Sequence, residues 1–400
     1  MLVRYKFIPF GNLLFPKTPI LPFMLLMRGF KNTVPTFLLV SRIIIIILLS
    51  SATSSPCMIN YNNGGVVQSP DCAAEWGLMV ELLKNSSEVC EFASLQGHRK
   101  YQEDRVSCNV GIRVPVIGKD EAKIDLLAVF DGHGGIEASE MAKQHLLDYF
   151  LVHIIAGAFK KASVVDHHHD SITSTQRSHG VLPAVDDKSL HDILKEALLG
   201  AIRDIDQKFS MEAFKKKYSA GSTASVVLLL NDEELLVGNV GDSRVILCAG
   251  YAEQLTHDHH PDRDDERARI EGAGGFVLDW DVPRVNGILA VSRAIGDVSL
   301  KRYGVIAEPE MVSWRNLTAK DGYLVISSDG VFESLTLVNV CQLIEDQETG
   351  TTNDRFPFLP SYSLAYCIVK TALERGSSDN LSAIVVPLAQ APGGVHKDEL

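Results

Sequence analysis

The chain has 400 residues, of which 46% are hydrophobic and 22% are charged, a composition that argues for a folded globular protein and against a disordered one. Its formal net charge of −12 argues against general affinity for nucleic acid or anionic lipid, which are themselves negative. The acidity fits either an ordinary soluble surface, the commoner case, or carboxylates gathered at a metal site.

The first predicted element is an apolar segment near the N-terminus. Residues 43–49 are uninterrupted Ile and Leu, with basic residues before them and small residues at 50–55. This layout is typical of a secretory signal peptide, and the run is shorter than the roughly 20 residues of a spanning helix. We expect residues 1–55 to be a leader with a signal peptide or, if uncleaved, a single-pass anchor; the alternative is a buried strand or helix.

The chain ends with Lys-Asp-Glu-Leu at 397–400, in the tail that we assign to residues 391–400. A receptor reads this sequence as an endoplasmic-reticulum retention signal, which has meaning only in the lumen. We therefore expect the protein in the endoplasmic reticulum lumen or endomembrane system, with membrane contact only through the N-terminal segment. Asn85 and Asn316 begin glycosylation sequons that would test this prediction.

The seven cysteines include no CxxC pair, so a zinc ribbon or a thioredoxin-type motif is disfavoured. Three of them lie within residues 57–90, where one disulfide is possible in an oxidising compartment. Because the total is odd, at least one thiol remains free or bonds to another molecule.

Residues 56–91 form a polar lead segment, and residues 92–390 have the pattern of one globular domain. An apolar run at 125–130 predicts a strand that ends at a glycine-rich turn, and helical spacing follows at 138–151. The polar break at 158–190 contains three histidines, at 167–169, which we interpret as part of a solvated loop. Helical spacing then returns at 190–209.

Strand patterns dominate the second half of the chain. The short apolar runs at 224–230, 235–240 and 244–248 are separated by tight turns, which predicts an antiparallel meander. Two further strands are expected at 322–327 and 382–386. Runs of strands and helices without strict alternation predict a layered α+β sandwich.

Carboxylates recur at the ends of these strands. Asp131 and Asp329 each follow a strand and precede a glycine, and Asp379 comes just before a third strand. Three carboxylates held together cannot all ionise without cations, and oxygen ligands favour Mg²⁺ or Mn²⁺. A turn or cap role is the commoner explanation for each aspartate alone, so only the set indicates a metal site.

Eight motifs make a family resemblance specific. In chain order they are Arg99 followed by Glu103-Asp104, the Asp-Gly-His-Gly-Gly run 131–135, Gly-Ser-Thr-Ala at 221–224, Gly-Asp-Ser-Arg at 241–244, Asp258-His259, Ala-Val-Ser-Arg-Ala-Ile-Gly-Asp at 290–297, Ser-Asp-Gly at 328–330, and Asp379-Asn380. Their types and order, over about residues 92–388, resemble metal-dependent serine/threonine protein phosphatases of type 2C, in particular plant members.

The resemblance implies a four-layer α/β/β/α sandwich with two central antiparallel sheets, a fold of the α+β class. It implies two bound Mg²⁺ or Mn²⁺ ions, with Asp242 supporting a third, weaker ion. Asp131 would bridge the two ions with the Gly132 carbonyl on one, and Asp329 and Asp379 would ligate the other. The residues implied at metals or their waters are Asp131, Gly132, Asp329, Asp379, Glu103, Asp104 and Asp242.

By the same resemblance, Arg99 would hold the substrate phosphate and His133 would protonate the leaving serine or threonine oxygen. A water shared by the two ions would be the nucleophile. Phosphoproteins would be the substrates of a monomeric enzyme that binds no nucleic acid. The alternatives are a non-catalytic binding module on this fold and a different two-metal hydrolase, such as a phosphodiesterase.

The chain departs from the usual family motif at two adjacent positions, and it has a tryptophan in a region that varies among family members. Phe332 and Glu333 stand where the family usually has tryptophan and aspartate; we expect the first to be tolerated and the second to alter the weaker metal site. Trp280 lies in the region that forms a flap near the active site, and in some plant members a tryptophan there docks a regulatory receptor. For Trp280 we expect a packed side chain rather than an exposed, partner-binding one.

Overall fold

The computed structural model describes residues 60–62, 65–67, 90–114, 121–166, 186–350 and 363–388. The predicted leader, the C-terminal tail and the histidine run at 167–169 lie outside these residues. Within the described ranges, no helix combines the length and apolar character needed to cross a membrane. The first described strands, β1 (Asn60–Asn62) and β2 (Gly65–Val67), pair as a short antiparallel hairpin.

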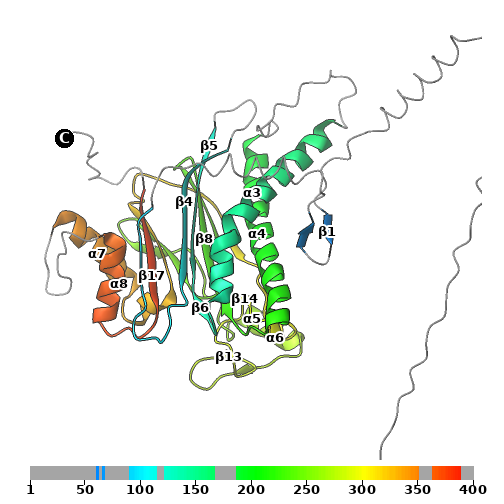
Figure 1. Cartoon of the computed structure of the whole chain (residues 1–400). Helices are drawn as coiled ribbons and strands as arrows, with labels where there is room; N and C mark the ends of the chain where they lie inside the picture. Colours follow the sequence, from blue (N-terminus) through cyan, green and yellow to red (C-terminus); the bar gives the residue numbers. More distant parts are fainter. Residues whose placement is uncertain are drawn as a thin grey trace, which may run out of the picture. The chain divides into compact units, whose positions relative to one another are not determined.

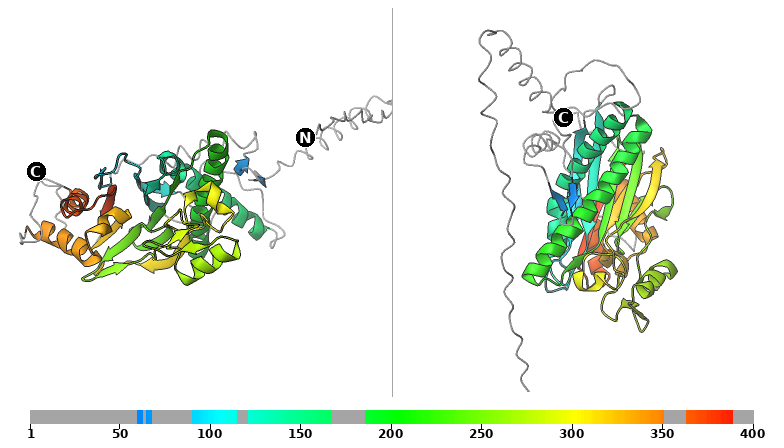
Figure 2. Two further views of the ribbon diagram at one scale, coloured as in Figure 1. Left: turned by 90° about the horizontal axis from the view of Figure 1, so that it is seen from below. Right: turned by 90° about the vertical axis from the view of Figure 1, so that its right-hand side faces the viewer.

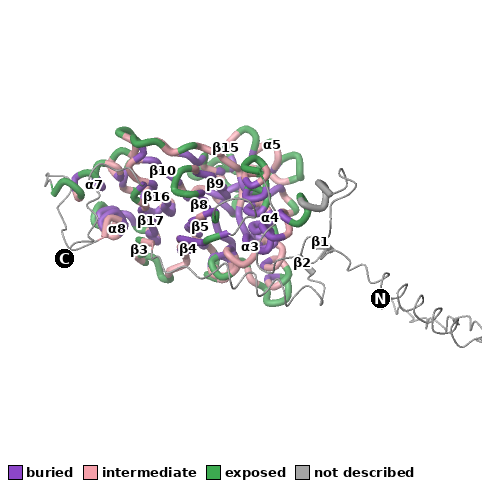
Figure 3. Tube along the Cα trace, turned by 90° about the horizontal axis from the view of Figure 1, so that it is seen from above, coloured by how far each residue is buried: buried purple, intermediate pink, exposed green. Residues whose placement is uncertain are grey.

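From residue 90 onward, two five-stranded antiparallel sheets lie between two pairs of helices (Figures 1 and 3). The first sheet has the order β15 (Glu310–Asn316), β9 (Glu234–Val240), β8 (Ala224–Leu230), β5 (Ala122–Phe130), β4 (Arg105–Val114). The second has the order β11 (Ala252–Gln254), β10 (Arg244–Cys248), β16 (Tyr323–Ser327), β17 (Leu381–Pro387), β3 (Phe92–Leu95).

Helices α3 (Glu137–Asp166) and α4 (Asp187–Lys216) run side by side next to the first sheet (Figure 2). Helices α7 (Leu337–Thr349) and α8 (Leu364–Glu374) cover the second sheet. The predicted α+β sandwich of the α/β/β/α type is therefore confirmed. The remaining elements are β6 (Gly132–His133), β7 (Gly221–Ser222), α5 (Asp264–Gly272), β12 (Val277–Leu278), β13 (Arg284–Val285), β14 (Ile295–Gly296), α6 (Val298–Lys301) and η1 (Asp329–Glu333).

The core explains why the strands appear in the sequence as continuous apolar runs. Leu127 and Val129 of β5 contribute to a buried cluster between the sheets, which also contains Leu324 and Ile326 of β16. Successive side chains of a strand point to opposite faces, so the intervening Leu126 and its neighbours face the helices, and they too are fully buried. A strand buried on both faces has no polar face, and its sequence therefore does not alternate.

Two predictions about the elements need correction. Strands β8 and β9 pair as expected, but β10 leaves the predicted meander and joins the second sheet, where it pairs with β11 and β16. Gly241, at φ +98°, allows the sharp turn that carries the chain between sheets, and nothing in the apolar run at 244–248 specifies which sheet it joins. The predicted break at 158–190 also begins later, because α3 continues to Asp166.

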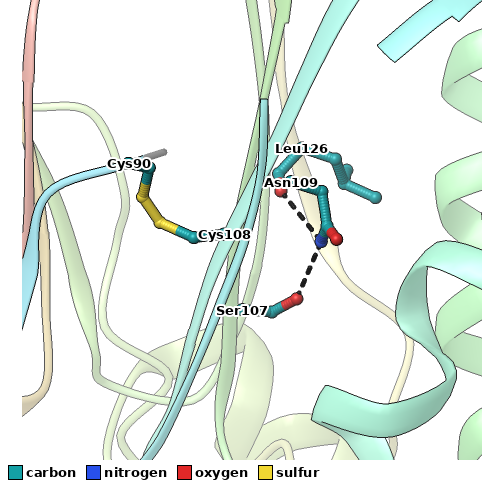
Figure 4. The surroundings of a disulfide bond; sticks show 5 residues. All are labelled: Cys90, Ser107, Cys108, Asn109 and Leu126. Carbon is teal, nitrogen blue, oxygen red and sulfur yellow. Dashed lines mark hydrogen bonds between the residues drawn. A yellow bond between two sulfur atoms is a disulfide. The ribbon is translucent and has the colours of Figure 1, made fainter. Parts of the chain in front are cut away.

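Two disulfides cross between layers of the structure. Cys90, just before β3, bonds to Cys108 in β4, with 5.9 Å between the Cα atoms (Figure 4). Cys248 at the end of β10 bonds to Cys341 in α7, with 5.5 Å between the Cα atoms and 93 residues separating them in sequence. Cys90 thus finds its partner outside the 57–90 segment, while Cys57 and Cys72 lie outside the described residues. Among the described cysteines, Cys367 is a buried free thiol.

Candidate active site and metal centre

The antiparallel topology collects the predicted site residues at one end of the sandwich. In the first sheet, β4 and β8 begin at the end where β5 and β9 finish; in the second, β10 and β17 begin where β16 and β3 finish. Each site residue occupies a connection at that end: Glu103 and Asp104 before β4, Asp131 after β5, Asp242 between β9 and β10, Asp329 after β16, Asp379 before β17, and Arg99 after β3.

The carboxylates at this end are close enough to perturb one another. Desolvation, together with the charges of Asp104 and Asp329, raises the pKa of Asp131 well above its usual value. Desolvation and the charge of Asp242 raise the pKa of Asp329 to about 7, and the side chains of Asp131 and Asp329 share a hydrogen bond. Without cations, the protein can hold this group together only by retaining protons.

Asp104 supplies the clearest indication that the group suits a metal ion. Its side chain is buried, and burial raises its pKa to about 6. Oδ2 accepts a hydrogen bond of 2.9 Å from the Ser328 hydroxyl, but Oδ1 has no hydrogen-bond partner among the described residues. A buried carboxylate oxygen without a donor is costly, and a divalent cation, or a water bound to one, supplies the missing positive partner.

No three His, Cys, Asp or Glu side chains within the described ranges are already arranged around a common metal position. Arg99 accounts for part of this, since its Nη2 atom lies 2.5 Å from Oδ2 of Asp379 and neutralises that carboxylate. The Arg99 side chain is 58% exposed, so it is free to exchange this partner for another anion. The residues present fit divalent cations by their oxygen chemistry and by their unrelieved mutual repulsion.

Buried hydroxyl groups hold the Asp131 and Asp242 turns in register. The Thr223 hydroxyl accepts a 2.9 Å hydrogen bond from the Asp131 backbone N–H and lies 2.8 Å from the Ser243 hydroxyl. These contacts give Thr223 and Ser243 a structural role within the Gly-Ser-Thr-Ala and Gly-Asp-Ser-Arg motifs, although neither hydroxyl was predicted to matter. The signal in the sequence was small polar residues at the ends of otherwise apolar strands.

Asn380 braces the loop that carries Arg99 and Glu103. Its Oδ1 atom accepts a 2.8 Å hydrogen bond from the Glu103 N–H, and its Nδ2 donates to the carbonyls of Gln96 and Tyr101. Gly132 meets the same loop from the other side, where a Cβ would lie 2.4 Å from the Glu103 carbonyl oxygen. Any side chain at Gly132 would therefore push Glu103 away from the site.

The two departures from the family pattern both have structural partners. Glu333 Oε2 accepts hydrogen bonds from the Ser377 hydroxyl (3.0 Å) and the Ser378 N–H (2.9 Å), which holds the loop just before Asp379. Its hydrogen bonds thus brace a ligand-bearing loop. Phe332 packs against the guanidinium of Arg244, 4.8 Å from ring centre to Cζ, as an aromatic residue in this position is expected to do.

His133 has a partner that the sequence analysis did not assign. Its Nε2 atom lies 2.7 Å from Oδ2 of Asp297, whose side chain is only 8% exposed. Burial lowers the pKa of His133, but the hydrogen bond and charge of Asp297 outweigh burial, so the pKa is raised. Asp297 is the last residue of the motif at 290–297, and this position was the only indication in the sequence that it belongs to the site.

The flap, residues 275–288 around strands β12 and β13, extends at the same end as β6 and β14 (Figure 1). Trp280 is 90% exposed, so the prediction of a packed tryptophan was wrong. The reason is local: the flap is a two-stranded hairpin whose tip, residues 278–282, is exposed among the described residues, and Arg267 of α5 holds it through a 2.7 Å ion pair with Asp279.

A family model described as Protein phosphatase 2C matches residues 89–381. The "Probable protein phosphatase 2C 51" of Arabidopsis thaliana is 39% identical over 418 residues, covering 84% of this chain and 78% of that protein.

Two solved structures share the fold. Serine-threonine phosphatase 2C from Toxoplasma gondii has a TM-score of 0.56 at 22% identity, covering 76% of this chain and 97% of that chain. A sex-determining protein of C. elegans has a TM-score of 0.55 at 24% identity, covering 86% of this chain and 81% of that chain. At such identities the likeness supports the fold alone.

Proposed function

This chain belongs to the protein phosphatase 2C family of metal-dependent protein phosphatases, and we propose that it hydrolyses phosphoserine and phosphothreonine in proteins with two bound Mg²⁺ or Mn²⁺ ions. The observation that carries the proposal is the convergence of carboxylates from both sheets at one end of the sandwich, where burial and mutual repulsion raise the pKa values of Asp104, Asp131 and Asp329. Holding such a group together in ionised form is costly unless cations neutralise it.

Asp131, Asp329 and Asp379 are the proposed direct ligands, together with the Gly132 carbonyl. Glu103 and Asp104 are proposed to hold ion-bound waters, and Asp242 to support a third, weaker ion. The ions, when bound, neutralise the carboxylates and the substrate phosphate and lower the pKa of the attacking water.

The chain's own residues supply substrate binding and proton transfer. Arg99 stands at the exposed rim and is proposed to exchange Asp379 for two oxygens of the substrate phosphate, which its planar guanidinium matches. His133 is proposed to give its proton to the serine or threonine oxygen as the P–O bond breaks, because an alkoxide is a poor leaving group. No covalent phosphoenzyme is required.

The proposed activity is tested by phosphate release from a phosphothreonine peptide by the full-length chain. We expect turnover with Mn²⁺ or Mg²⁺ and none with excess chelator, since Asp104 and its neighbours cannot act together without cations. A phosphodiester, bis-p-nitrophenyl phosphate, should be hydrolysed far more slowly. Efficient diester hydrolysis would favour a different two-metal hydrolase, and a folded, metal-binding protein without turnover would favour the binding module.

We propose the endoplasmic reticulum lumen as the compartment, and the two disulfides support this proposal because they persist in oxidising compartments and are rare in the cytosol. In protein purified from its native cells under thiol-blocking conditions, we expect the Cys248–Cys341 peptide pair to be disulfide-linked. Asn316, which is exposed at the end of β15, is expected to carry an N-glycan. Alkylated, unpaired Cys248 together with unmodified Asn316 would exclude the lumen, and Cys367 serves as the internal control for a free thiol.

A further inference from the structure

Three short strands bring His133 and Asp297 to opposite sides of one glycine. They form a small sheet with the order β14-β7-β6, in which Gly221 of β7 pairs with His133 of β6 and with Gly296 of β14. Figure 1 shows β6 and β14 at the same end of the molecule as the flap. The backbone pairing of these strands thereby brings His133 and Asp297, 164 positions apart in sequence, next to each other.

Gly221 leaves the space in which the two side chains meet. A Cβ at this position would lie 2.0 Å from Oδ2 of Asp297 and 2.4 Å from Nε2 of His133. Real Cβ atoms do not approach other atoms so closely, so any other residue at position 221 would separate the pair. The glycine of the Gly-Ser-Thr-Ala motif is therefore explained by the contact between His133 and Asp297.

The backbone of Asp297 is held in an unfavourable conformation. Its φ is +47°, in the left-handed region that costs most non-glycine residues free energy. Its N–H donates to the Ala220 carbonyl (3.1 Å), and the preceding Gly296 N–H donates to the Asp206 side chain (2.8 Å). Asp206 in turn forms an ion pair of 2.9 Å with Lys301. A strained position anchored on several sides points to a functional constraint on the side chain it carries.

From this geometry we infer that Asp297 is a positioning residue, which fixes the His133 imidazole so that Nδ1 carries the proton given to the leaving oxygen. The inference rests on the proposed function. Asp297 accepts the hydrogen bond from Nε2–H, so Nδ1 is the ring nitrogen left for the substrate. In the reaction, water adds to phosphorus, the P–O bond to the serine or threonine breaks, and its electron pair stays on the oxygen, which takes the proton from Nδ1.

The Asp297 carboxylate can have a structural role or can orient His133, and the two roles predict different effects on different substrates. Asp297 itself makes no side-chain hydrogen bond to a residue that we propose as a metal ligand. A purely structural Asp297 would affect all substrates alike when replaced. A residue that orients a proton donor affects only the substrates whose leaving group needs a proton.

The test is to compare two substrates in Asp297→Asn and Asp297→Gly, because Asn and Gly both tolerate a positive φ and preserve the backbone. With saturating Mn²⁺, we expect kcat for a phosphothreonine peptide to fall by roughly 30- to 100-fold at unchanged KM, a part of the typical contribution of a general acid. For p-nitrophenyl phosphate, whose phenolate leaves without a proton, we expect a fall of less than about threefold. Asp281→Asn removes an exposed carboxylate from the flap and is expected to change neither rate.

Equal losses on both substrates, or no loss on either, would overturn the inference. If the wild-type protein hydrolyses neither substrate, the proposed function fails, and a measurement independent of activity then decides on Asp297. In proton–nitrogen correlation spectra, the His133 Nε2–H should give a slowly exchanging, downfield resonance in the wild type that is lost in Asp297→Gly. Absence of that resonance in the wild type would refute the contact itself.

Discussion

Asp131→Asn is expected to reduce phosphate release from a phosphothreonine peptide by about 10³-fold or more while leaving the protein folded. The charges of Asp104, Asp329 and Asp242 all raise the pKa of Asp131, so its carboxylate is close enough to interact with each of them. Asparagine keeps the backbone N–H that donates to Thr223 (2.9 Å) and nearly the same volume, but loses the charge. A loss of roughly 4 kcal/mol of transition-state stabilisation corresponds to this factor.

The same substitution has a second consequence that separates catalysis from folding. Removing one of several mutually repelling charges is expected to raise the melting temperature of the metal-free protein above that of the wild type. We therefore expect Asp131→Asn to lower turnover in steady-state kinetics with Mn²⁺ and to raise the melting temperature measured with chelator. An inactive variant that melts at a much lower temperature would indicate that Asp131 is needed for the fold, and a variant with near-normal turnover would remove Asp131 from the mechanism.

The elements of the fold were predictable wherever burial imposes a pattern on the sequence. The apolar runs of β5, which include Leu127 and Val129, and of β8 predict strands, because both faces of these strands are buried. The assignment of β10 to the second sheet was not predictable from the sequence pattern. It depends on the turn at Gly241, and an apolar strand of five residues fits either sheet equally well.

Asp131, Asp329 and Asp379 were predictable because each lies at the end of a strand, and antiparallel pairing brings those strand ends together. Glu103, Asp104 and Asp242 were assigned only through the resemblance to the family. The supporting residues were not predictable, since their roles depend on contacts between distant motifs. Asn380 braces Glu103 across 277 positions of sequence, and Asp297 meets His133 across 164. Trp280 was predicted wrongly for a related reason: an aromatic residue in a sequence does not reveal whether a second layer covers it.

In the metal-free protein, the raised pKa values of the site carboxylates make the stability of the fold depend on pH. In the unfolded chain an aspartate ionises near pH 4, whereas in the fold the pKa of Asp329 is about 7 and that of Asp131 is also raised. Above pH 4 the folded state therefore holds more protons than the unfolded state, and its stability falls as pH rises through the folded pKa. His259 acts in the opposite direction, because burial lowers its pKa to about 4, but most of its effect is already present at pH 6.5, the pKa of an unfolded histidine.

Between pH 6.5 and pH 8.5, the melting temperature of the chelated protein is accordingly expected to fall, by roughly 2 °C or more. Saturating Mn²⁺ is expected to raise it, and by a larger amount at pH 8.5 than at pH 6.5, because cations bind the deprotonated ligands. Asp329→Asn removes one of the titrating carboxylates and is expected to reduce the pH dependence, whereas the exposed Asp281→Asn leaves it unchanged. A metal-induced shift of equal size at both pH values would mean that the ions bind away from these carboxylates, because ions bound to them must displace the protons that the carboxylates hold at pH 6.5.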